Sequence, residues 1–284
     1  MLAAILKIAL GIAIALPLVV YLLQDRLMFF PQPLSPARRA AVAARFPAVT
    51  SVTLRTADGK QVHAWQVQAT PGAPLVLYFG GNAEEVSGML EAIGDPHGGA
   101  TPGVGWLLLD YRGYGASEGT PSEAALTADA RMLYDHARTL AGPSARIFAF
   151  GRSLGSGVAV ALAASRALDG VVLLTPFDSA LAVAERYYPF LPVRWMMKHR
   201  FESLRLAPQL RIPLLCVIAE RDEVIPPIHG ERLFDAWAGP KQKLILPGAG
   251  HNDGDGPALW TAVLGFLRQW GQTPVDNAPE VSPK

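Results

Sequence analysis

Short apolar runs alternate with longer amphipathic stretches from about residue 49 to residue 270. Runs of this kind, bounded by glycine, proline and polar residues, are typical of buried strands. The predicted strands cover 49–56, 61–68, 74–79, 104–110, 146–150, 170–174, 212–219 and 242–246. Helices are predicted between the later strands and after the last one, at about 83–93, 120–140, 156–164 and 257–270. This alternation predicts an α/β fold with a mostly parallel eight-stranded sheet and helices on both faces.

The first 23 residues follow a different pattern, because apolar residues surround the whole predicted helix and Lys7 is its only charge. A helix of this length reaches the thickness of a bilayer core. We therefore expect an N-terminal transmembrane anchor over residues 1–24 and a single-pass membrane protein. The alternative is a cleaved signal peptide with Ala13-Ile14-Ala15 as its cleavage site. Lys7 and the amino terminus oppose Arg26, Arg38, Arg39 and Arg45 after the segment, so its orientation in the membrane stays open.

Proline and charge divide the rest of the chain. Residues 25–48 are predicted to be a proline-containing connector with a short basic helix. Residues 49–271 form the predicted α/β domain. Residues 272–284 combine three prolines with mixed charge, and we expect a disordered tail there.

Composition narrows the class of protein. The chain has 284 residues, of which 50% are hydrophobic and 17% are charged, so a large core can form. A formal net charge of +1 argues against a nucleic-acid partner, since such proteins are usually strongly basic. The single cysteine, Cys216, excludes an internal disulfide and a thiolate metal cluster. The sequence contains no phosphate loop and no His-Glu-x-x-His motif, so we expect no cofactor and no metal.

The segment Gly151-Arg152-Ser153-Leu154-Gly155 is the strongest chemical signal in the chain. It lies between a predicted strand and a predicted helix of small residues, which is the arrangement of a nucleophile elbow. Such a tight turn needs glycine on both sides of the serine. The turn holds the serine hydroxyl above the sheet edge, where the helix N-terminus directs N–H groups and the positive end of its dipole. Ser153 is therefore the predicted nucleophile.

A serine nucleophile needs a histidine base and an acid that orients the histidine. Behind an elbow, the acid and then the histidine follow the serine in loops after later strands. Asp222 follows the seventh predicted strand, and His251 follows the eighth in a glycine-rich loop. With Ser153 they form the predicted catalytic triad. Asp178, after the sixth strand, is the alternative acid, and His229 is the alternative base.

The oxyanion of an acyl-transfer reaction needs two N–H donors. The first predicted donor is the backbone N–H of Leu154, which follows the nucleophile. The second is the N–H of Asn82, because the glycines before it in Gly80-Gly81-Asn82 allow close approach. We interpret Asp110, at the end of the fourth predicted strand, and Arg112, in the glycine-rich loop after it, as loop-bracing residues rather than catalytic ones.

An apolar, aromatic insert lies between the sixth and seventh predicted strands, and we expect it to form a short cap. Tyr188, Phe190 and Trp195 are its candidate substrate-binding residues. They are expected to line an acyl pocket or to touch lipid. The alternative is a helix pair that packs on the core.

With these residues identified, the sequence from about Val49 to Trp270 resembles the α/β-hydrolase family. More narrowly, it resembles the membrane-anchored abhydrolase-domain subgroup, which includes depalmitoylase-like proteins. The matching segments are Arg26-Leu27-Met28-Phe29-Phe30-Pro31-Gln32-Pro33, Gly81-Asn82-Ala83, Asp110-Tyr111-Arg112-Gly113-Tyr114-Gly115, Gly151-Arg152-Ser153-Leu154-Gly155, Thr175-Pro176-Phe177-Asp178-Ser179 and Gly250-His251-Asn252. In one departure, Gly80 stands where the subgroup usually has histidine, which bears on how the oxyanion loop is braced.

The resemblance implies the α/β-hydrolase fold and a serine hydrolase with Ser153, Asp222 and His251 as its triad. We predict hydrolysis of a carboxylic ester or thioester through an acyl-enzyme, with membrane lipid contacted through the N-terminal helix. Two alternatives stay open. One is an amidase or peptidase with the same triad, and the other is a membrane-tethered binding protein without catalysis.

Overall fold

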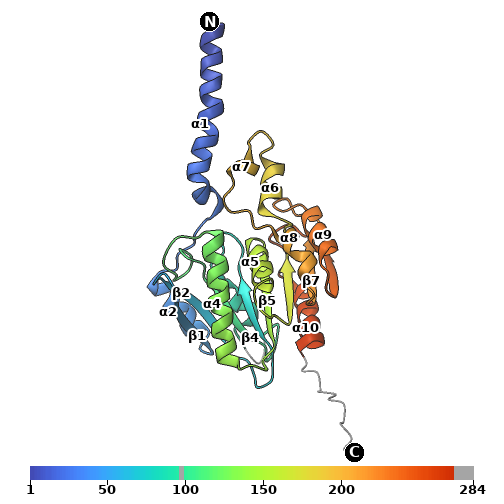
Figure 1. The fold of residues 1–284 in the computed structure, drawn as a ribbon. Helices are drawn as coiled ribbons and strands as arrows, with labels where there is room; N and C mark the ends of the chain where they lie inside the picture. The colour runs from blue at the N-terminus through green and yellow to red at the C-terminus, as the bar shows by residue number, and fades with distance from the viewer. Residues whose placement is uncertain (96–98, 272–284) are drawn as a thin grey trace, which may run out of the picture.

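The structure is a computed structural model that describes residues 1–95 and 99–271, without the side chains of residues 9, 10, 12 and 14. Its sheet has the strand order β1-β2-β4-β3-β5-β6-β7-β8. The strands are β1 (Val49–Arg55), β2 (Gln61–Val67), β3 (Leu75–Phe79), β4 (Gly105–Leu109), β5 (Ile147–Arg152), β6 (Gly170–Leu174), β7 (Leu214–Ala219) and β8 (Lys241–Leu246). The pairs β1–β2 and β2–β4 are antiparallel, and the other pairs are parallel. The predicted mostly parallel, eight-stranded α/β sheet is confirmed (Figure 1).

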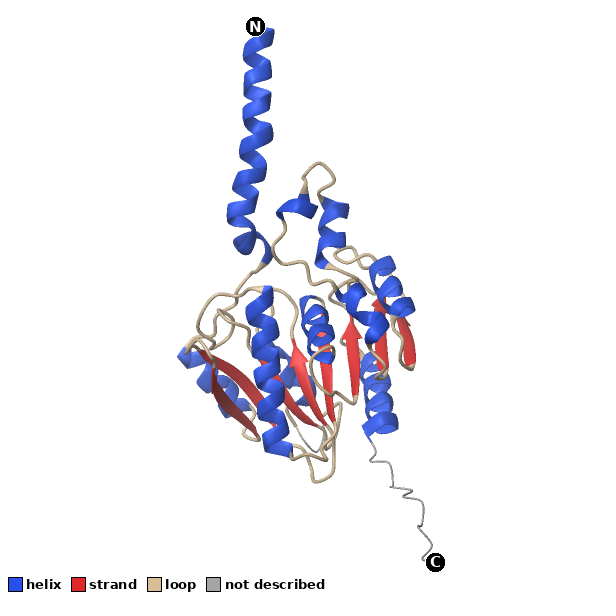
Figure 2. Cartoon of the chain, viewed as in Figure 1, coloured by secondary structure: helices blue, strands red, loops and turns tan. Residues whose placement is uncertain are grey.

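Helices cover both faces of this sheet (Figure 2). They are α1 (Leu2–Met28), α2 (Pro36–Arg45), α3 (Leu90–Ile93), α4 (Glu123–Ala141), α5 (Leu154–Ala163), α6 (Ala180–Tyr187), α7 (Val193–Met196), α8 (Ser203–Leu206), α9 (Pro227–Ala236) and α10 (Pro257–Gly271), with 3₁₀ turns η1 (Val86–Met89) and η2 (Ala207–Gln209). Several begin at local signals, since Ser35, Ser122 and Ser179 each accept a first-turn N–H.

The helix predicted over 83–93 forms only in its second half. Ala83 has a φ of 58°, in the left-handed region, which a right-handed helix cannot contain. The Glu84 side chain binds back to the loop through the Gly81 N–H at 2.6 Å. Residues 82–85 therefore remain a loop, and that loop reaches the nucleophile.

Alternate residues of the central strands face opposite sides of the sheet, so each strand contributes to two cores. Leu77 of β3 and Ala149 of β5 belong to the core under α4, α5 and α9. Tyr78 and Phe150, next to them in sequence, belong to the core under α3 and α10. Burial on both faces explains why these strands appear in the sequence as continuous apolar runs. The rigid sheet fixes the carboxyl ends of its strands, where the loops described below begin.

The helix α1 extends away from the sheet at the same end of the molecule as α6 and α7 (Figure 1). It continues past residue 24 to Met28. Near this end, Gln24 Nε2 donates to the Met196 carbonyl oxygen at 3.1 Å, and Asp25 Oδ1 lies 2.9 Å from His199 Nε2. Among the described residues, no helix combines the length and the apolarity that crossing a bilayer requires. The transmembrane anchor that we expected over residues 1–24 is therefore not found, and the last turn of α1 binds the cap. The tail predicted over 272–284 lies outside the described residues.

Candidate active site

Ser153 lies at the sharp turn between β5 and α5, with a φ of 50°. The turn brings α5 against β3, because a Cβ at Gly155 would lie 1.9 Å from the carbonyl oxygen of Phe79. A Cβ at Gly151 would lie 2.3 Å from the carbonyl oxygen of Gly155. Only glycine fits at either position. The helix begins at Leu154, so its unpaired first-turn N–H groups and positive dipole end start beside the serine.

The structure brings together the three side chains that the sequence proposed as a triad. Nε2 of His251 lies 2.9 Å from Oγ of Ser153, and Nδ1 of His251 lies 2.7 Å from Oδ2 of Asp222. The second carboxylate oxygen of Asp222 accepts the N–H groups of Val224 at 2.9 Å and Ile225 at 2.7 Å. This buried carboxylate favours the tautomer with a proton on Nδ1, which leaves Nε2 as the acceptor for the serine proton.

Two loops after neighbouring strands supply the acid and the histidine. Asp222 follows β7 and His251 follows β8, and the loops are joined by the N–H of Arg221, which donates to the Ala249 carbonyl oxygen at 2.8 Å. The histidine loop is also tied to the elbow, because Nη2 of Arg152 donates to Oδ1 of Asn252 at 3.0 Å. These contacts hold the imidazole above the elbow.

The alternative acid and the alternative base contact each other. Oδ1 of Asp178 lies 2.8 Å from Nδ1 of His229, and both side chains are only 3% exposed. The same oxygen accepts the N–H of Ser179 at 2.6 Å, at the start of α6. This pair therefore connects the start of α6 to α9, whereas His251 is paired with Asp222.

The loop after β3 reaches the nucleophile, because a Cβ at Gly81 would lie 3.6 Å from Cβ of Ser153. Within residues 1–95 and 99–271, the N–H groups of Asn82 and Leu154 donate to no protein acceptor. Asn82 belongs to the β3 loop, and Leu154 belongs to the first turn of α5. Both can therefore donate to an oxyanion that forms on a carbonyl attacked by Ser153.

Glu84 braces this loop, a role that was not predicted from the sequence. Its Oε2 accepts the Gly81 N–H at 2.6 Å and lies 3.2 Å from Nη1 of Arg152, while its Oε1 accepts the Tyr78 hydroxyl at 2.6 Å. Burial, and then the charge of Glu84, hold the pKa of Tyr78 well above its ordinary value, so Tyr78 remains a donor. A Cβ at Gly80 would lie 3.2 Å from the Glu84 carboxyl carbon, so this carboxylate occupies the space beside Gly80. The signal for Glu84 was local, a carboxylate three residues after a loop N–H.

A second Ser–His–Asp chain lies on the antiparallel part of the sheet. Oγ of Ser51 lies 2.8 Å from Nε2 of His63, and Nδ1 of His63 lies 2.8 Å from Oδ2 of Asp110. Ser51 pairs with Trp65 in the middle of the β1–β2 ladder, so it follows no elbow and precedes no helix. Asp110 also accepts the N–H of Ala116 at 3.2 Å, in agreement with the loop-bracing role expected for it.

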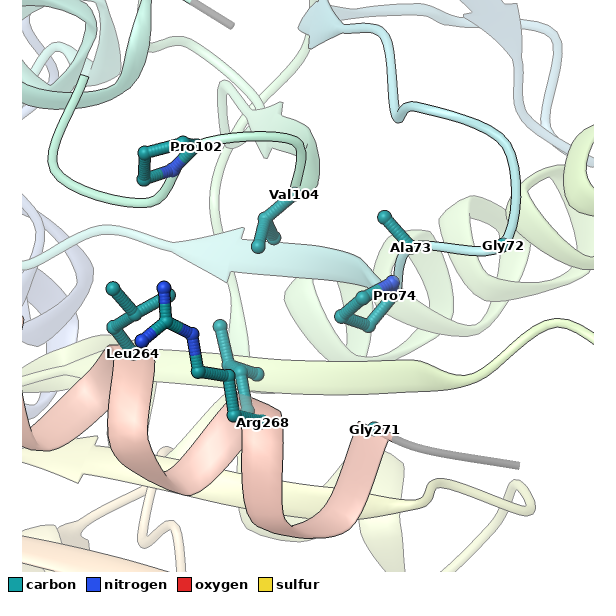
Figure 3. Close-up of a pocket in the computed structure, with 9 residues that line it drawn as sticks. Gly72, Ala73, Pro74, Pro102, Val104, Leu264, Arg268 and Gly271 are labelled. Atoms are coloured by element: carbon teal, nitrogen blue, oxygen red, sulfur yellow. The ribbon is translucent and has the colours of Figure 1, made fainter. Parts of the chain in front are cut away.

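The aromatic residues expected to bind substrate lie in the cap insert, at the α6–α7 tip (Figure 1). Tyr188 is 57% exposed, Phe190 97% and Trp195 84%, so they do not line an enclosed pocket. A shallow hollow exists instead at the opposite edge of the sheet, where Pro74 and Val104 precede β3 and β4 and face the end of α10 (Figure 3). Ser153 follows the carboxyl end of β5, so that hollow is not part of the candidate active site.

Comparisons with known proteins agree with this fold. A family profile described as "Serine aminopeptidase, S33" matches residues 100–208. The chain is 37% identical over 255 residues to "Uncharacterized protein Rv2307c" of Mycobacterium tuberculosis, covering 87% of this chain and 88% of the relative. It is 26% identical to "Alpha/beta hydrolase domain-containing protein WAV2" of Arabidopsis thaliana, covering 92% of each. The acetyl xylan esterase from Paenibacillus sp. R4 has a similar structure, with a TM-score of 0.62 and 17% identity over 87% of this chain and 98% of the esterase. The chain therefore belongs to the α/β-hydrolase family.

Proposed function

We propose that this protein is a serine hydrolase that cleaves carboxylic esters or thioesters through an acyl-enzyme. The observation that supports this most strongly is the continuous contact from Asp222 through His251 to Ser153, at 2.7 Å and 2.9 Å. A hydroxyl on a strained turn, hydrogen-bonded to an imidazole that a buried carboxylate orients, is an activated nucleophile.

The reaction proceeds in two acyl transfers. Nε2 of His251 removes the Ser153 proton as Oγ attacks the carbonyl carbon, and the N–H groups of Leu154 and Asn82 stabilise the tetrahedral oxyanion. The carbon–oxygen or carbon–sulfur bond then breaks, and His251 returns the proton to the leaving alcohol or thiol. Water attacks the acyl-enzyme with His251 as base, which releases the carboxylic acid and restores Ser153.

The amidase or peptidase alternative uses the same steps with an amine leaving group, and the description of the matching family favours it as the second candidate. A p-nitrophenyl ester, a thioester and a p-nitroanilide with the same acyl group separate the two candidates by kcat/KM. We expect the ester and the thioester to be cleaved faster than the anilide.

Labelling by a fluorophosphonate, which phosphonylates activated serines, tests the nucleophile. We expect labelling of the full-length chain, complete loss of labelling in Ser153→Ala, and wild-type labelling in Ser51→Ala. Ser51 is the matched control, because it also contacts a His–Asp pair but has no elbow. Labelling that survives in Ser153→Ala and disappears in Ser51→Ala would show that the wrong serine has been assigned.

We further propose that the apolar surface at the α1 end of the molecule binds lipid. Leu18 and Leu22 of α1 are exposed, as are Phe190 and Trp195 at the α6–α7 tip. Exposed tryptophan and phenylalanine beside basic residues are typical of surfaces that enter a membrane interface. Between residues 180 and 200 the sequence has four Arg or Lys residues against one acidic residue, which favours anionic lipid.

Sedimentation with phosphatidylglycerol vesicles tests this surface. The double variant Phe190→Ser with Trp195→Ser should bind roughly tenfold more weakly than wild type, because two large apolar groups no longer enter the lipid. The variant Leu140→Ser is the control, since Leu140 is an exposed apolar residue at the far end of α4. Equal binding by the tip variant and the control would rule the tip out.

A further inference from the structure

The chain that leaves α1 is hydrogen-bonded to Asn82, which supplies the proposed second oxyanion donor. Nδ2 of Asn82 donates to the Met28 carbonyl oxygen at 2.6 Å. Oδ1 of Asn82 accepts the N–H of Phe30 at 3.0 Å and the hydroxyl of Tyr114 at 2.7 Å. The Phe30 N–H also donates to the Tyr114 hydroxyl oxygen at 3.0 Å, so Asn82 and Tyr114 share this one donor. The position of the Asn82 side chain therefore depends on the position of residues 28–30.

Tyr114 is the fixed member of this group. It is fully buried and packs edge-on against Tyr111, with ring centroids 5.8 Å apart. Burial raises the pKa of the Tyr114 hydroxyl to about 12, so the group stays protonated and donates to Asn82 while it accepts from Phe30. Tyr111 donates to the Gly80 carbonyl oxygen at 3.0 Å, so the oxyanion loop is held at a second point by the same aromatic pair.

The last turn of α1 is held in place by residues of the cap and of α4. Glu123 N–H donates to Nδ1 of His199 at 3.3 Å, which leaves Nε2 of His199 to donate to Asp25 at 2.9 Å. Phe29 is buried and packs edge-on against the His199 ring at 5.1 Å. The last turn of α1, which ends at Met28, is thus docked on the folded domain next to the residues that bind Asn82. A shift of this turn moves residues 28–30 and, through their hydrogen bonds, Asn82.

We propose that Tyr114 and residues 28–30 position the oxyanion hole, so that the docking of α1 on the cap sets the rate of acyl transfer. This inference rests on the proposed function. The oxyanion exists only after Ser153 has attacked, so a displaced Asn82 N–H weakens transition-state stabilisation and leaves substrate binding almost unchanged. The left-handed φ of Ala83, 58°, is a conformation that non-glycine residues rarely adopt, and the hydrogen bonds on both sides of it keep the loop in that conformation.

Kinetics of Tyr114→Phe in the full-length chain test the proposal with an ester substrate. We expect kcat to fall roughly tenfold and KM to stay within about twofold, because one oxyanion donor is displaced rather than removed. Asn82→Ala keeps the backbone N–H but loses the side-chain hydrogen bonds to Met28, Phe30, Ala83 and Tyr114, and we expect an equal or larger fall in kcat. Tyr134→Phe is the control, since its hydroxyl donates to the Ala167 carbonyl oxygen at 2.8 Å in a different part of the fold. It should keep the wild-type kcat.

An alkylboronic acid distinguishes positioning from general destabilisation, because its tetrahedral adduct with serine has the charge of the reaction intermediate. The proposal is supported if its inhibition constant rises in Tyr114→Phe and Asn82→Ala by the factor by which kcat falls. It is overturned if both variants keep the wild-type kcat and the wild-type boronate affinity. It is also overturned if kcat and Tm fall together while the boronate affinity stays at the wild-type value. Fluorophosphonate labelling separates a failure of the proposed function from a failure of the positioning role. If the wild-type protein is not labelled at Ser153, the proposed function itself is contradicted. Normal labelling with unaltered Tyr114→Phe kinetics contradicts only the positioning role.

Discussion

The double variant Ser153→Ala with His251→Ala is expected to hydrolyse a p-nitrophenyl ester no more slowly than either single variant. Each single substitution should lower kcat by roughly 10⁶-fold, because the hydroxyl and the imidazole are useless to the reaction without each other. The 2.9 Å contact between them is the physical basis of this coupling. Independent contributions would instead multiply, and the double variant would then be far slower than both singles. Asp222→Asn should lower kcat by roughly 10⁴-fold, because it leaves the imidazole in the wrong tautomer.

Burst kinetics and thermal unfolding complete this test. Ser153→Ala should show no acyl-enzyme burst and should keep the wild-type Tm, since alanine and serine tolerate the positive φ at residue 153 about equally. Asp178→Asn is the informative comparison, because Asp178 is paired with His229. It should keep the kcat of the folded enzyme even where it lowers Tm. A loss of kcat in Asp178→Asn as large as that in Asp222→Asn would mean that the acid has been misassigned.

The sheet and the three meeting side chains were predictable because each is marked locally. The buried strands are continuous apolar runs, and glycines mark the turn around Ser153. Parallel topology then places the loops after β5, β7 and β8 at one edge, so chain order alone brings Asp222 and His251 toward the serine. Their roles in catalysis remain predictions that the experiments above test.

The residues that hold the β3 loop beside the site could not be predicted in the same way. Met28 and Phe30 meet Asn82 across more than fifty residues of sequence, and no periodicity or turn signal marks such a pair. The same holds for Glu84 and Arg152, whose 3.2 Å contact depends on how the β3 loop packs on the elbow. The transmembrane anchor expected over residues 1–24 is not found among the described residues. Apolar composition does not show that the last turn of α1 docks on the cap.

Gly155→Ala is expected to destabilise the fold by about 3 kcal/mol or more, with loss of activity in whatever fraction remains folded. The added methyl would lie 1.9 Å from the carbonyl oxygen of Phe79 and 2.7 Å from that of Gly80, and both partners are backbone atoms that no rotamer change can move. To make room, α5 must move away from β3, which separates Leu154 from the loop that carries Asn82. The stability of a domain is typically about 5–15 kcal/mol, so this change removes a large share of it.

Gly265→Ala is the matched control for urea unfolding, because Gly265 is an exposed helical glycine whose added methyl meets nothing within 4 Å. It should raise the free energy of unfolding by about 0.5–1 kcal/mol, since alanine has less backbone entropy to lose in a helix. Opposite signs in the two variants would show that the contact with β3, rather than helix propensity, decides the outcome at the elbow. A Gly155→Ala protein as stable and active as wild type would mean that α5 does not approach β3 this closely, and the placement of both oxyanion donors would then have to be redrawn.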